Sequence, residues 1–215
     1  TVTLEMASNF SSGQQLTLGT KGVTDISPNA NSSNGSAPIT LLEPSYALPE
    51  VQTATATGRG FVAANQRQLP TAADAKWTIN AFVYMDQQPG DLSLIAGFGT
   101  GRDQGGAQRF LIKNEGHIYF WGSSIDIDSN VPFDLNRWQM VTISYDGTMV
   151  RIYKDGKEIK SEEASFADAA PLVRVGPPPA WRYGNRFAGK VAGLSIWNDA
   201  LPADYIKALL TTGPK

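Results

Sequence analysis

The stretch WQMVTISYDGTMVRIYKDGK, residues 138–157, is the most informative part of the chain for the fold. It contains two runs, 138–145 and 149–154, in which apolar and polar residues alternate as they do in β-strands with one buried face. Each run is followed by Asp-Gly, which favours a tight reversal because glycine adopts positive φ without steric cost. The stretch therefore predicts two strands, each followed by a turn.

Short alternating runs separated by turn residues continue on both sides of this stretch. Only the end of the chain has a helical pattern: Pro202 suits a first turn, and Ile206, Leu209 and Leu210 recur at three- and four-residue spacing. Many strands without intervening helices predict an all-β sandwich or barrel. The further predicted strands are residues 77–85, 92–98, 108–113, 117–121, 171–175 and 190–197, and the predicted helix is 202–210.

The first 58 residues are rich in Ser, Thr, Asn and Gly and carry weaker signals. Short strands are predicted at residues 2–6, 15–18 and 39–42, and residues 27–38 (SPNANSSNGSAP) are predicted to be a polar connection. A chain of 215 residues has the size of one large β-sandwich. We therefore expect a single domain over residues 1–215.

Composition excludes several classes of partner and site. The net charge is −2 and the basic residues are scattered, which argues against nucleic acid and anionic membrane surfaces as partners. No apolar run approaches the roughly 18 residues that cross a bilayer, so we expect no membrane insertion. Cysteine is absent, which excludes disulfides, thiolate metal sites and cysteine nucleophiles.

Residues 138–157 resemble the central signature of laminin-G-like jelly rolls, which runs Trp, apolar strand, Tyr-Asp-Gly, strand, Tyr, Asp-Gly-Lys. Residues 77–83 (WTINAFV) are similar to the family's first well-marked strand, and residues 187–201 to its closing strand. The resemblance covers about residues 59–210. It implies a concanavalin A-like fold, a two-sheet antiparallel jelly-roll sandwich with a short C-terminal helix. The family includes lectins, pentraxins and β-glucanases, so it implies either binding or catalysis.

One segment is similar to a catalytic strand of the β-glucanases, whose motif is Glu-x-Asp-x-x-Glu. Asp126 and Asp128 would share one face of a strand, as glycoside hydrolysis requires of two carboxylates. Aligned on Asp126, however, Ser124 and Ser129 stand where the motif has its glutamates. The nucleophile and the acid are both missing, so we predict no catalytic residues and expect the chain not to be an enzyme.

Neither a catalytic triad nor a metal site has a recognisable motif. His117 is the only histidine, and no Gly-x-Ser-x-Gly elbow accompanies it. Calcium is common among relatives, and Asp126, Asp128, Asn130 and Asp134 would supply hard oxygens. They do not follow a known coordination loop. We therefore expect no cofactor and no metal, with calcium as the one ion to consider.

Alternation along residues 117–121 (HIYFW) predicts the first candidate binding cluster. If Ile118 and Phe120 face the core, as Phe110 and Ile112 would on the neighbouring strand, the remaining side chains share the opposite face. Aromatic rings beside cationic groups complement a sugar, whose apolar C–H faces are ringed by hydroxyls. The alternative, that the rings are covered and form a second small core, stays open. The predicted binding residues are Arg109, His117, Tyr119 and Trp121.

The loop GPPPAWRYGNR, residues 176–186, is the second candidate. Its three prolines lower the entropy cost of presenting aromatic side chains at the rim of a sandwich. The alternative is a rigid edge cover in which Trp181 packs on the sheet below, whereas we expect Trp181 to be exposed and Trp138 to be the costly core tryptophan. The predicted binding residues of this loop are Trp181, Arg182, Tyr183 and Asn185.

These observations together predict a non-catalytic recognition domain of an exported bacterial protein that binds a carbohydrate or glycoconjugate. The expected location is secreted, periplasmic or at the cell surface. A structural or protein-interaction module of a larger chain is the main alternative. A glycoside hydrolase with a non-standard centre is the less favoured one.

Overall fold

The structure is a computed structural model that describes residues 15–24, 32–40, 43–54, 61–62, 66, 68–86, 92–102, 105–176 and 187–214. The chain divides into two compact units, residues 1–44 and 45–215. The single domain expected over residues 1–215 stays a prediction. The division into units follows strand pairing, because the described strands of the first unit pair only with each other.

The first unit contains an antiparallel hairpin of β1 (Gln15–Thr24) and β2 (Ser32–Thr40). Its register shifts once, between Thr20 and Val23 of β1. The prediction of a polar connection over residues 27–38 was therefore wrong for the part that forms β2. A strand is held by backbone hydrogen bonds, so a segment rich in Ser, Asn and Gly can pair when a partner strand is adjacent.

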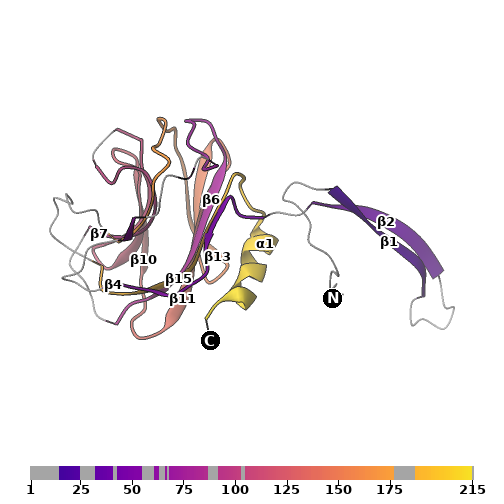
Figure 1. Cartoon of the computed structure of the whole chain (residues 1–215). Coiled ribbons are helices and arrows are strands. Elements are labelled where there is room, and N and C mark those ends of the chain that lie inside the picture. Colours follow the sequence, from indigo (N-terminus) through magenta and orange to yellow (C-terminus); the bar gives the residue numbers. More distant parts are fainter. Residues whose placement is uncertain are drawn as a thin grey trace. The chain divides into compact units, whose positions relative to one another are not determined.

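The second unit is a sandwich of two antiparallel sheets, seen as two layers in Figure 1. The predicted jelly-roll sandwich with a short C-terminal helix is confirmed. The six-stranded sheet has the order β10 (Asp126–Pro132), β9 (His117–Trp121), β8 (Arg109–Asn114), β7 (Ser93–Phe98), β14 (Val173–Val175) and β5 (Phe61–Val62). The seven-stranded sheet has the order β13 (Lys157–Glu163), β12 (Met149–Lys154), β11 (Trp138–Tyr145), β6 (Trp77–Tyr84), β15 (Gly189–Trp197) and β3 (Tyr46–Leu48), and β4 (Gln52–Ala54) also pairs with β15.

Glycine-containing dipeptides form the turns between neighbouring strands at the positions expected from the sequence. Glu115 and Gly116 have φ of 50° and 86° between β8 and β9, and Asp155 and Gly156 have φ of 48° and 75° between β12 and β13. Two successive residues with positive φ match the twist of a hairpin and are tolerated when the second is glycine. These turns bring the sequence-adjacent strands together in each sheet.

The core lies between the two sheets and is centred on Trp77 of β6, which is completely buried. Its indole stacks on Phe120 with ring centroids 5.7 Å apart and meets Phe98 edge-on at 6.4 Å. Tyr145 and Phe166 also contact it, at 5.8 and 5.9 Å. Aromatic rings from both sheets thus pack against one another and hold the two layers together.

Trp138 is not the core tryptophan that the sequence predicted. It is only partly buried at the start of β11, where it meets Tyr84 edge-on with ring centroids 5.6 Å apart. Trp138 pairs with Tyr84 across strands, and side chains alternate along β6, so both lie on the face opposite Trp77 and its neighbours in the core. A Trp at the first position of a strand does not reveal which face of the sheet its side chain occupies.

The C-terminal segment covers the outer face of the seven-stranded sheet. Helix α1 (Ala203–Leu209) lies beside this sheet in Figure 1, followed by a short 3-10 turn, Leu210–Thr212. The Thr78 hydroxyl on this face donates to the Asp199 carbonyl at 2.7 Å and accepts from the Leu201 amide at 2.9 Å. Gly213 packs so closely on the Phe82 ring that a Cβ at this position would collide with it. The outer face of the six-stranded sheet is therefore the other large sheet surface of this unit.

Candidate functional site

A row of five residues crosses the outer face of the six-stranded sheet. Arg174 is the backbone partner of Gly97, Gly97 of Phe110, Phe110 of Trp121, and Trp121 of Asp126. Residues directly opposite one another on neighbouring strands share a face. The residues that alternate with them along the strands belong mostly to the core between the sheets, so this outer row faces away from it.

A second, smaller core lies on this outer face. Leu94, Phe110, Ile112 and Trp121 form a buried apolar cluster, against which Tyr119 packs. The rings of Phe110 and Trp121 are stacked with centroids 6.0 Å apart. Trp121 is only 5% exposed, so the alternative interpretation, a covered aromatic core, applies to Trp121. Tyr119 is half-buried and is the aromatic residue of this cluster that reaches solvent.

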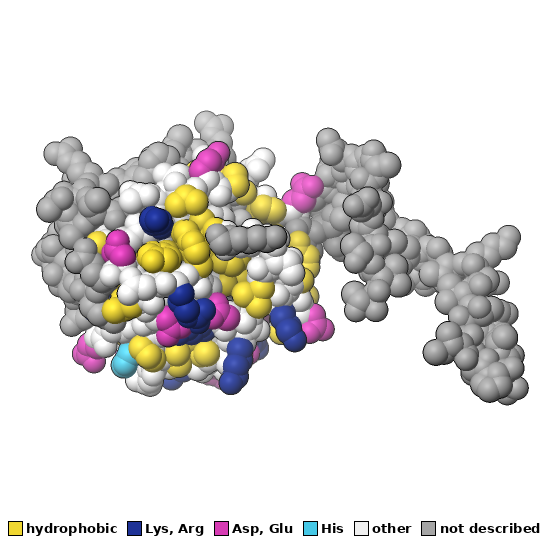
Figure 2. Space-filling model, turned by 90° about the horizontal axis from the view of Figure 1, so that it is seen from below, with side chains coloured by type: hydrophobic (Ala, Val, Ile, Leu, Met, Phe, Trp, Pro, Cys, Tyr) yellow, Lys and Arg dark blue, Asp and Glu magenta, His cyan; other side chains and the backbone are white. Residues whose placement is uncertain are grey.

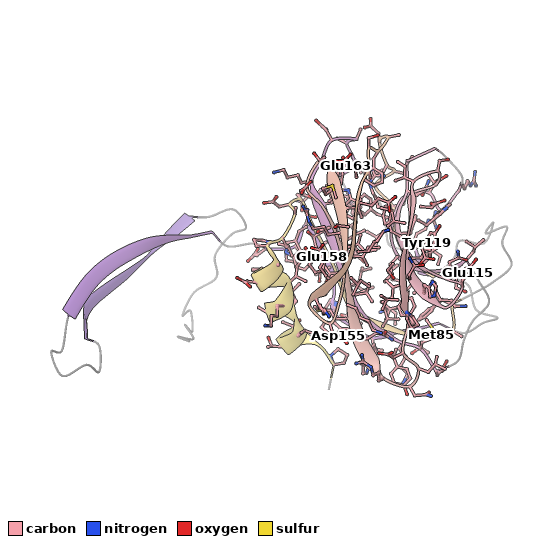
Figure 3. All side chains as sticks on the ribbon, turned by 180° about the vertical axis from the view of Figure 1, so that it is seen from behind. Met85, Glu115, Tyr119, Asp155, Glu158 and Glu163 are labelled. Atoms are coloured by element: carbon pink, nitrogen blue, oxygen red, sulfur yellow. The ribbon has the colours of Figure 1, made fainter. Side chains whose placement is uncertain are left out.

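Acidic residues surround Tyr119 on the side of β10. Asp128 is its direct cross-strand partner, and Asp126 lies on the same face of β10. Burial raises the pKa of the Tyr119 phenol, and the charges of Asp126 and Asp128 raise it further. The phenol therefore remains a neutral hydroxyl at physiological pH, able both to donate and to accept a hydrogen bond. Figure 3 shows Tyr119 and Glu115 on the side of this sheet, away from Glu158 and Glu163 of the other sheet.

His117 shares the face of Tyr119, as the sequence predicted, and is paired with Asp128. The His117 Nδ1 atom lies 3.1 Å from both carboxylate oxygens of Asp128. The Asn130 amide donates to the same carboxylate at 2.7 Å. Both side chains of the pair are about a third exposed, at 29% and 30%, and the histidine reaches the surface in Figure 2. This pair forms a polar edge beside the aromatic cluster.

The oxygen ligands considered for calcium do not converge among the described residues. Asp134 accepts from Arg137 Nε at 2.7 Å and lies 3.0 Å from Lys154 Nζ, while Asp128 is engaged by His117. No group of three or more His, Cys, Asp or Glu side chains in the described part of the chain is arranged to hold a metal ion. The Asp134 oxygens are thus used in ion pairs with two cations.

Arg109 was wrongly predicted to lie beside Tyr119 and Trp121. It pairs with Phe98 of β7, points into the sandwich and is completely buried. Its guanidinium carbon lies 3.9 Å from the centroid of the Phe166 ring, and its amino groups donate to the carbonyls of Gly106 at 2.8 Å and Ala167 at 2.9 Å. Burial lowers its pKa to about 10, which leaves the group charged at neutral pH. Arg109 is a core residue and is not available to a ligand on the outer face.

Arg174 is the cation that the structure places on this face instead. It lies at the end of the outer row, is 9% exposed, and donates from Nε to the Gly99 carbonyl at 3.2 Å. Burial lowers its pKa, and the charge of Arg102 lowers it further. The sequence contains the necessary signal, because Val173 and Val175 of β14 are apolar and alternation turns Arg174 away from the core.

The loop after β7 is built by one buried side chain, Gln108. Its Oε1 accepts from the Gly101 amide at 3.0 Å, and its Nε2 donates to Thr100 Oγ1 at 3.0 Å and to the Arg102 carbonyl at 2.8 Å. A fourth bond of the loop, from the Arg102 amide to Thr100 Oγ1, is 3.2 Å long. Gln108 thus holds the backbone at Gly101 and Arg102, and the carbonyl of the nearby Gly99 accepts from Arg174.

A family model described as concanavalin A-like lectin/glucanases superfamily, of the laminin G type, matches residues 56–207. The chain belongs to this superfamily. No curated protein sequence matches it significantly. Within the described residues, no helix is both long and apolar enough to cross a membrane.

Solved structures with the same superfamily fold include three from carbohydrate-active proteins. The CBM40 of Ruminococcus gnavus IT-sialidase bound to α2,3-sialyllactose has a TM-score of 0.60 at 14% identity, covering 79% of this chain and 100% of that one. Domain 4 of the GH43 extracellular arabinanase AbnA from Geobacillus stearothermophilus, in complex with arabinotriose, has a TM-score of 0.53 at 17% identity, covering 75% and 87%. Trypanosoma rangeli sialidase in complex with 2,3-difluorosialic acid has a TM-score of 0.57 at 18% identity, covering 76% of this chain but 28% of the enzyme. At these identities the likeness establishes the fold alone.

The second predicted cluster of this superfamily member lies outside the described residues. It consists of Trp181, Arg182, Tyr183 and Asn185. Of the first cluster, the structure brings His117, Tyr119 and Trp121 together on one face. It adds Asp126, Asp128 and, at the far end of the outer row, Arg174, which the sequence analysis did not select.

Proposed function

We propose that the chain is a non-catalytic carbohydrate-recognition domain whose ligand binds on the outer face of the six-stranded sheet. The observation that carries this proposal is the environment of Tyr119, a half-buried ring that packs against the buried cluster containing Trp121, with Asp126 and Asp128 beside it. A ring at the surface stacks on the apolar face of a sugar, and flanking carboxylates accept hydrogen bonds from its hydroxyls. Trp121 belongs to the buried cluster against which Tyr119 packs.

The absence of catalysis is part of the proposal. Asp126 and Asp128 share one face as predicted, but Asp128 is held by His117 and by the Asn130 amide. Ser124 and Ser129 occupy the positions of the two glutamates in the similar β-glucanase motif. The structural neighbours support binding, since the CBM40 of a sialidase and domain 4 of an arabinanase are each seen with a bound oligosaccharide.

We further propose that the chain comes from an exported bacterial protein and acts in the periplasm, at the cell surface or outside the cell. A domain of similar fold belongs to an arabinanase that is described as extracellular, which supports this. The residues Trp181, Arg182, Tyr183 and Asn185 remain a proposed second part of the ligand site.

Titration of the whole chain with oligosaccharides tests the proposal. The panel should include α2,3-sialyllactose, arabinotriose and common plant and bacterial polysaccharides, followed by calorimetry or intrinsic fluorescence. Tyr119→Ala should lower affinity about fivefold, because one aromatic contact contributes about 1 kcal/mol. Tyr84→Ala is the matched control, since Tyr84 is a half-buried tyrosine on the other sheet and should leave binding unchanged. Absence of binding across the panel would contradict the proposal.

A protein-interaction module is the second candidate function, and the β1–β2 hairpin favours it. A two-stranded hairpin is marginally stable by itself, and this one pairs with no strand of the sandwich. A partner protein that adds strands or covers one face would stabilise it. Light scattering after gel filtration would test this, since a strictly monomeric chain that binds glycans would count against a self-association role.

A further inference from the structure

Arg174 is a buried cation for which the described residues provide no carboxylate. The residue is only 9% exposed, and its hydrogen bond to the described part of the chain runs from Nε to the Gly99 carbonyl. Burying an unpaired charge is costly, and proteins usually place a partner beside it. The two terminal nitrogens of the guanidinium are the groups that pair with a carboxylate in a two-pronged arrangement.

A second cation, Arg102, follows Gly99 by three residues, and the Gly99 carbonyl accepts from Arg174 Nε at 3.2 Å. The charge of Arg102 acts on the guanidinium of Arg174. Like charges destabilise one another, so both would gain from an anion bound between them. Arg102 is exposed, yet its backbone is fixed because Gln108 and Thr100 bind it on both sides. A rigid backbone loses little entropy when it contributes to a binding site.

The other described arginines satisfy their charges within the chain. Arg137 is paired with Asp134 and Asp155, and Arg151 with Asp146. Arg109 lies over the Phe166 ring and donates to backbone carbonyls. Among the described ion pairs, none includes Arg102 or Arg174. The chain has a net charge of −2, so an excess of positive charge does not explain why these two arginines have no ion pair among the described residues.

We propose that Arg174 and Arg102 form a subsite for the carboxylate of an acidic sugar, such as a uronic or sialic acid. This rests on the proposed function and names the class of ligand. The outer row has opposite charges at its two ends, with Arg174 on β14 and Asp126 on β10. The two ends are about 19 Å apart, which is four spacings between strands. An acidic group is therefore attracted to one end and repelled from the other, which sets the direction of the ligand.

Two pairs of matched ligands test this with the full chain. Trigalacturonate is compared with its methyl ester, and α2,3-sialyllactose with its methyl ester, because the members of each pair differ only in whether the carboxylates are free or esterified. Calorimetric titration should show at least one acidic ligand bound about ten times more tightly than its neutral counterpart, with the difference shrinking as NaCl is raised. Equal affinity within both pairs, or failure of both acidic ligands to bind, overturns the subsite.

Three substitutions locate the effect. Arg174→Met keeps most of the side-chain volume and should abolish the preference for the acidic ligand while leaving the affinity for its neutral counterpart unchanged. Arg102→Gln should reduce the preference severalfold. Lys190→Gln removes one positive charge from the other sheet and should change nothing, which separates a local effect from net charge. If Arg174→Met lowers affinity for both ligands of a pair equally, the role of Arg174 is structural and the inference fails.

The remaining outcomes separate this inference from the proposed function. Neutral glycans that bind, with a loss in Tyr119→Ala and no preference for acidic ligands, uphold the proposed function and overturn the subsite. Absence of all glycan binding overturns both. If thermal unfolding shows that Arg174→Met does not fold, Arg174→Lys takes its place, because it keeps the charge and loses the forked geometry. A preference unchanged in both Arg174→Lys and Arg102→Gln then rejects the subsite.

Discussion

Trp77 and Trp138 lie on adjacent strands but are used differently. Trp77 is completely buried against aromatic rings of both sheets, whereas Trp138 is partly exposed and contacts Tyr84. We expect Trp77→Ala to lower the free energy of unfolding by about 3–5 kcal/mol, because it leaves a large cavity. Trp138→Ala should cost about 1 kcal/mol. Chemical denaturation of the two variants beside the parent chain measures both.

Trp77→Phe provides a control for this pair. The Trp77 Nε1 atom is buried without a hydrogen-bond partner, so replacing the indole by a phenyl ring removes volume but also an unsatisfied polar group. Trp77→Phe should therefore cost less than Trp77→Ala. Equal losses in Trp77→Ala and Trp138→Ala would show that Trp138 belongs to the core after all.

The residues of β8 show where reading side-chain faces from sequence fails. Its positions from Arg109 to Lys113 are all buried, because this central strand is covered on both sides. Alternation of polar and apolar residues indicates which face of a strand is buried only when the opposite face is exposed to solvent. Phe110 and Ile112 were therefore assigned to the main core, although they belong to the second one, and the charged Arg109 was assigned outward. On β9, where His117 and Tyr119 are partly exposed, the assignment was correct.

The turn between β11 and β12 is the element with the clearest electrostatic stabilisation. Asp146 accepts from the amides of Met149 at 2.8 Å and Thr148 at 3.0 Å, and pairs with Arg151. These interactions, the Met149 amide first, lower its pKa from 3.8 to about 2. A carboxylate whose pKa is lower in the folded state stabilises the protein above the unfolded value, and the effect is lost as pH falls through the folded value.

Asp146→Asn should therefore be less stable than the parent chain at pH 7 and equally stable near pH 2. The side chain of Asp146 is 33% exposed, so solvent screening reduces the expected difference to about 1 kcal/mol. Urea unfolding at several pH values between 2 and 7 measures it. Asp86→Asn, which changes an exposed carboxylate at the end of β6, is the control and should have little effect. A difference that persists at pH 2 would show that packing, rather than charge, is what Asp146 contributes.

Strands with an apolar face were predicted well, and polar edge strands were not. β9, β11 and β12 begin and end at the predicted residues. β13 was missed because it is an edge strand of Lys, Glu and Ser with one apolar residue, Ile159, and no fully buried position. Charged residues on an edge strand prevent pairing with other chains, and this same property hides the strand from hydrophobic periodicity. β10, at the edge of the other sheet, was expected only as a polar strand edge.

At the scale of the whole molecule, the division into two units was not visible in the sequence. Length allowed one large domain, and the polar first quarter gave no sign of a separate hairpin. The candidate site was partly predictable, because His117 and Tyr119 were selected, whereas Arg174 required the strand order. β14 follows β9 by more than 50 residues in sequence yet lies in the same sheet, separated from it by β8 and β7. Only the topology places these residues on one face.

Truncation tests the independence of the second unit. Residues 45–215 contain every strand of both sandwich sheets and the whole core, and β1 and β2 pair with none of them. We expect a chain beginning at Ser45 to fold with a melting temperature within about 3 °C of the parent chain, because a change of 1 kcal/mol shifts it by about 2–4 °C at this size. A chain beginning at residue 55 is the matched control. It lacks β3 and β4, which pair with β15 next to the core, so it should melt well below the parent chain or fail to fold. If the chain beginning at Ser45 were destabilised as much as the shorter one, the hairpin would have to contribute to the stability of the sandwich, and the two units would form one cooperative domain.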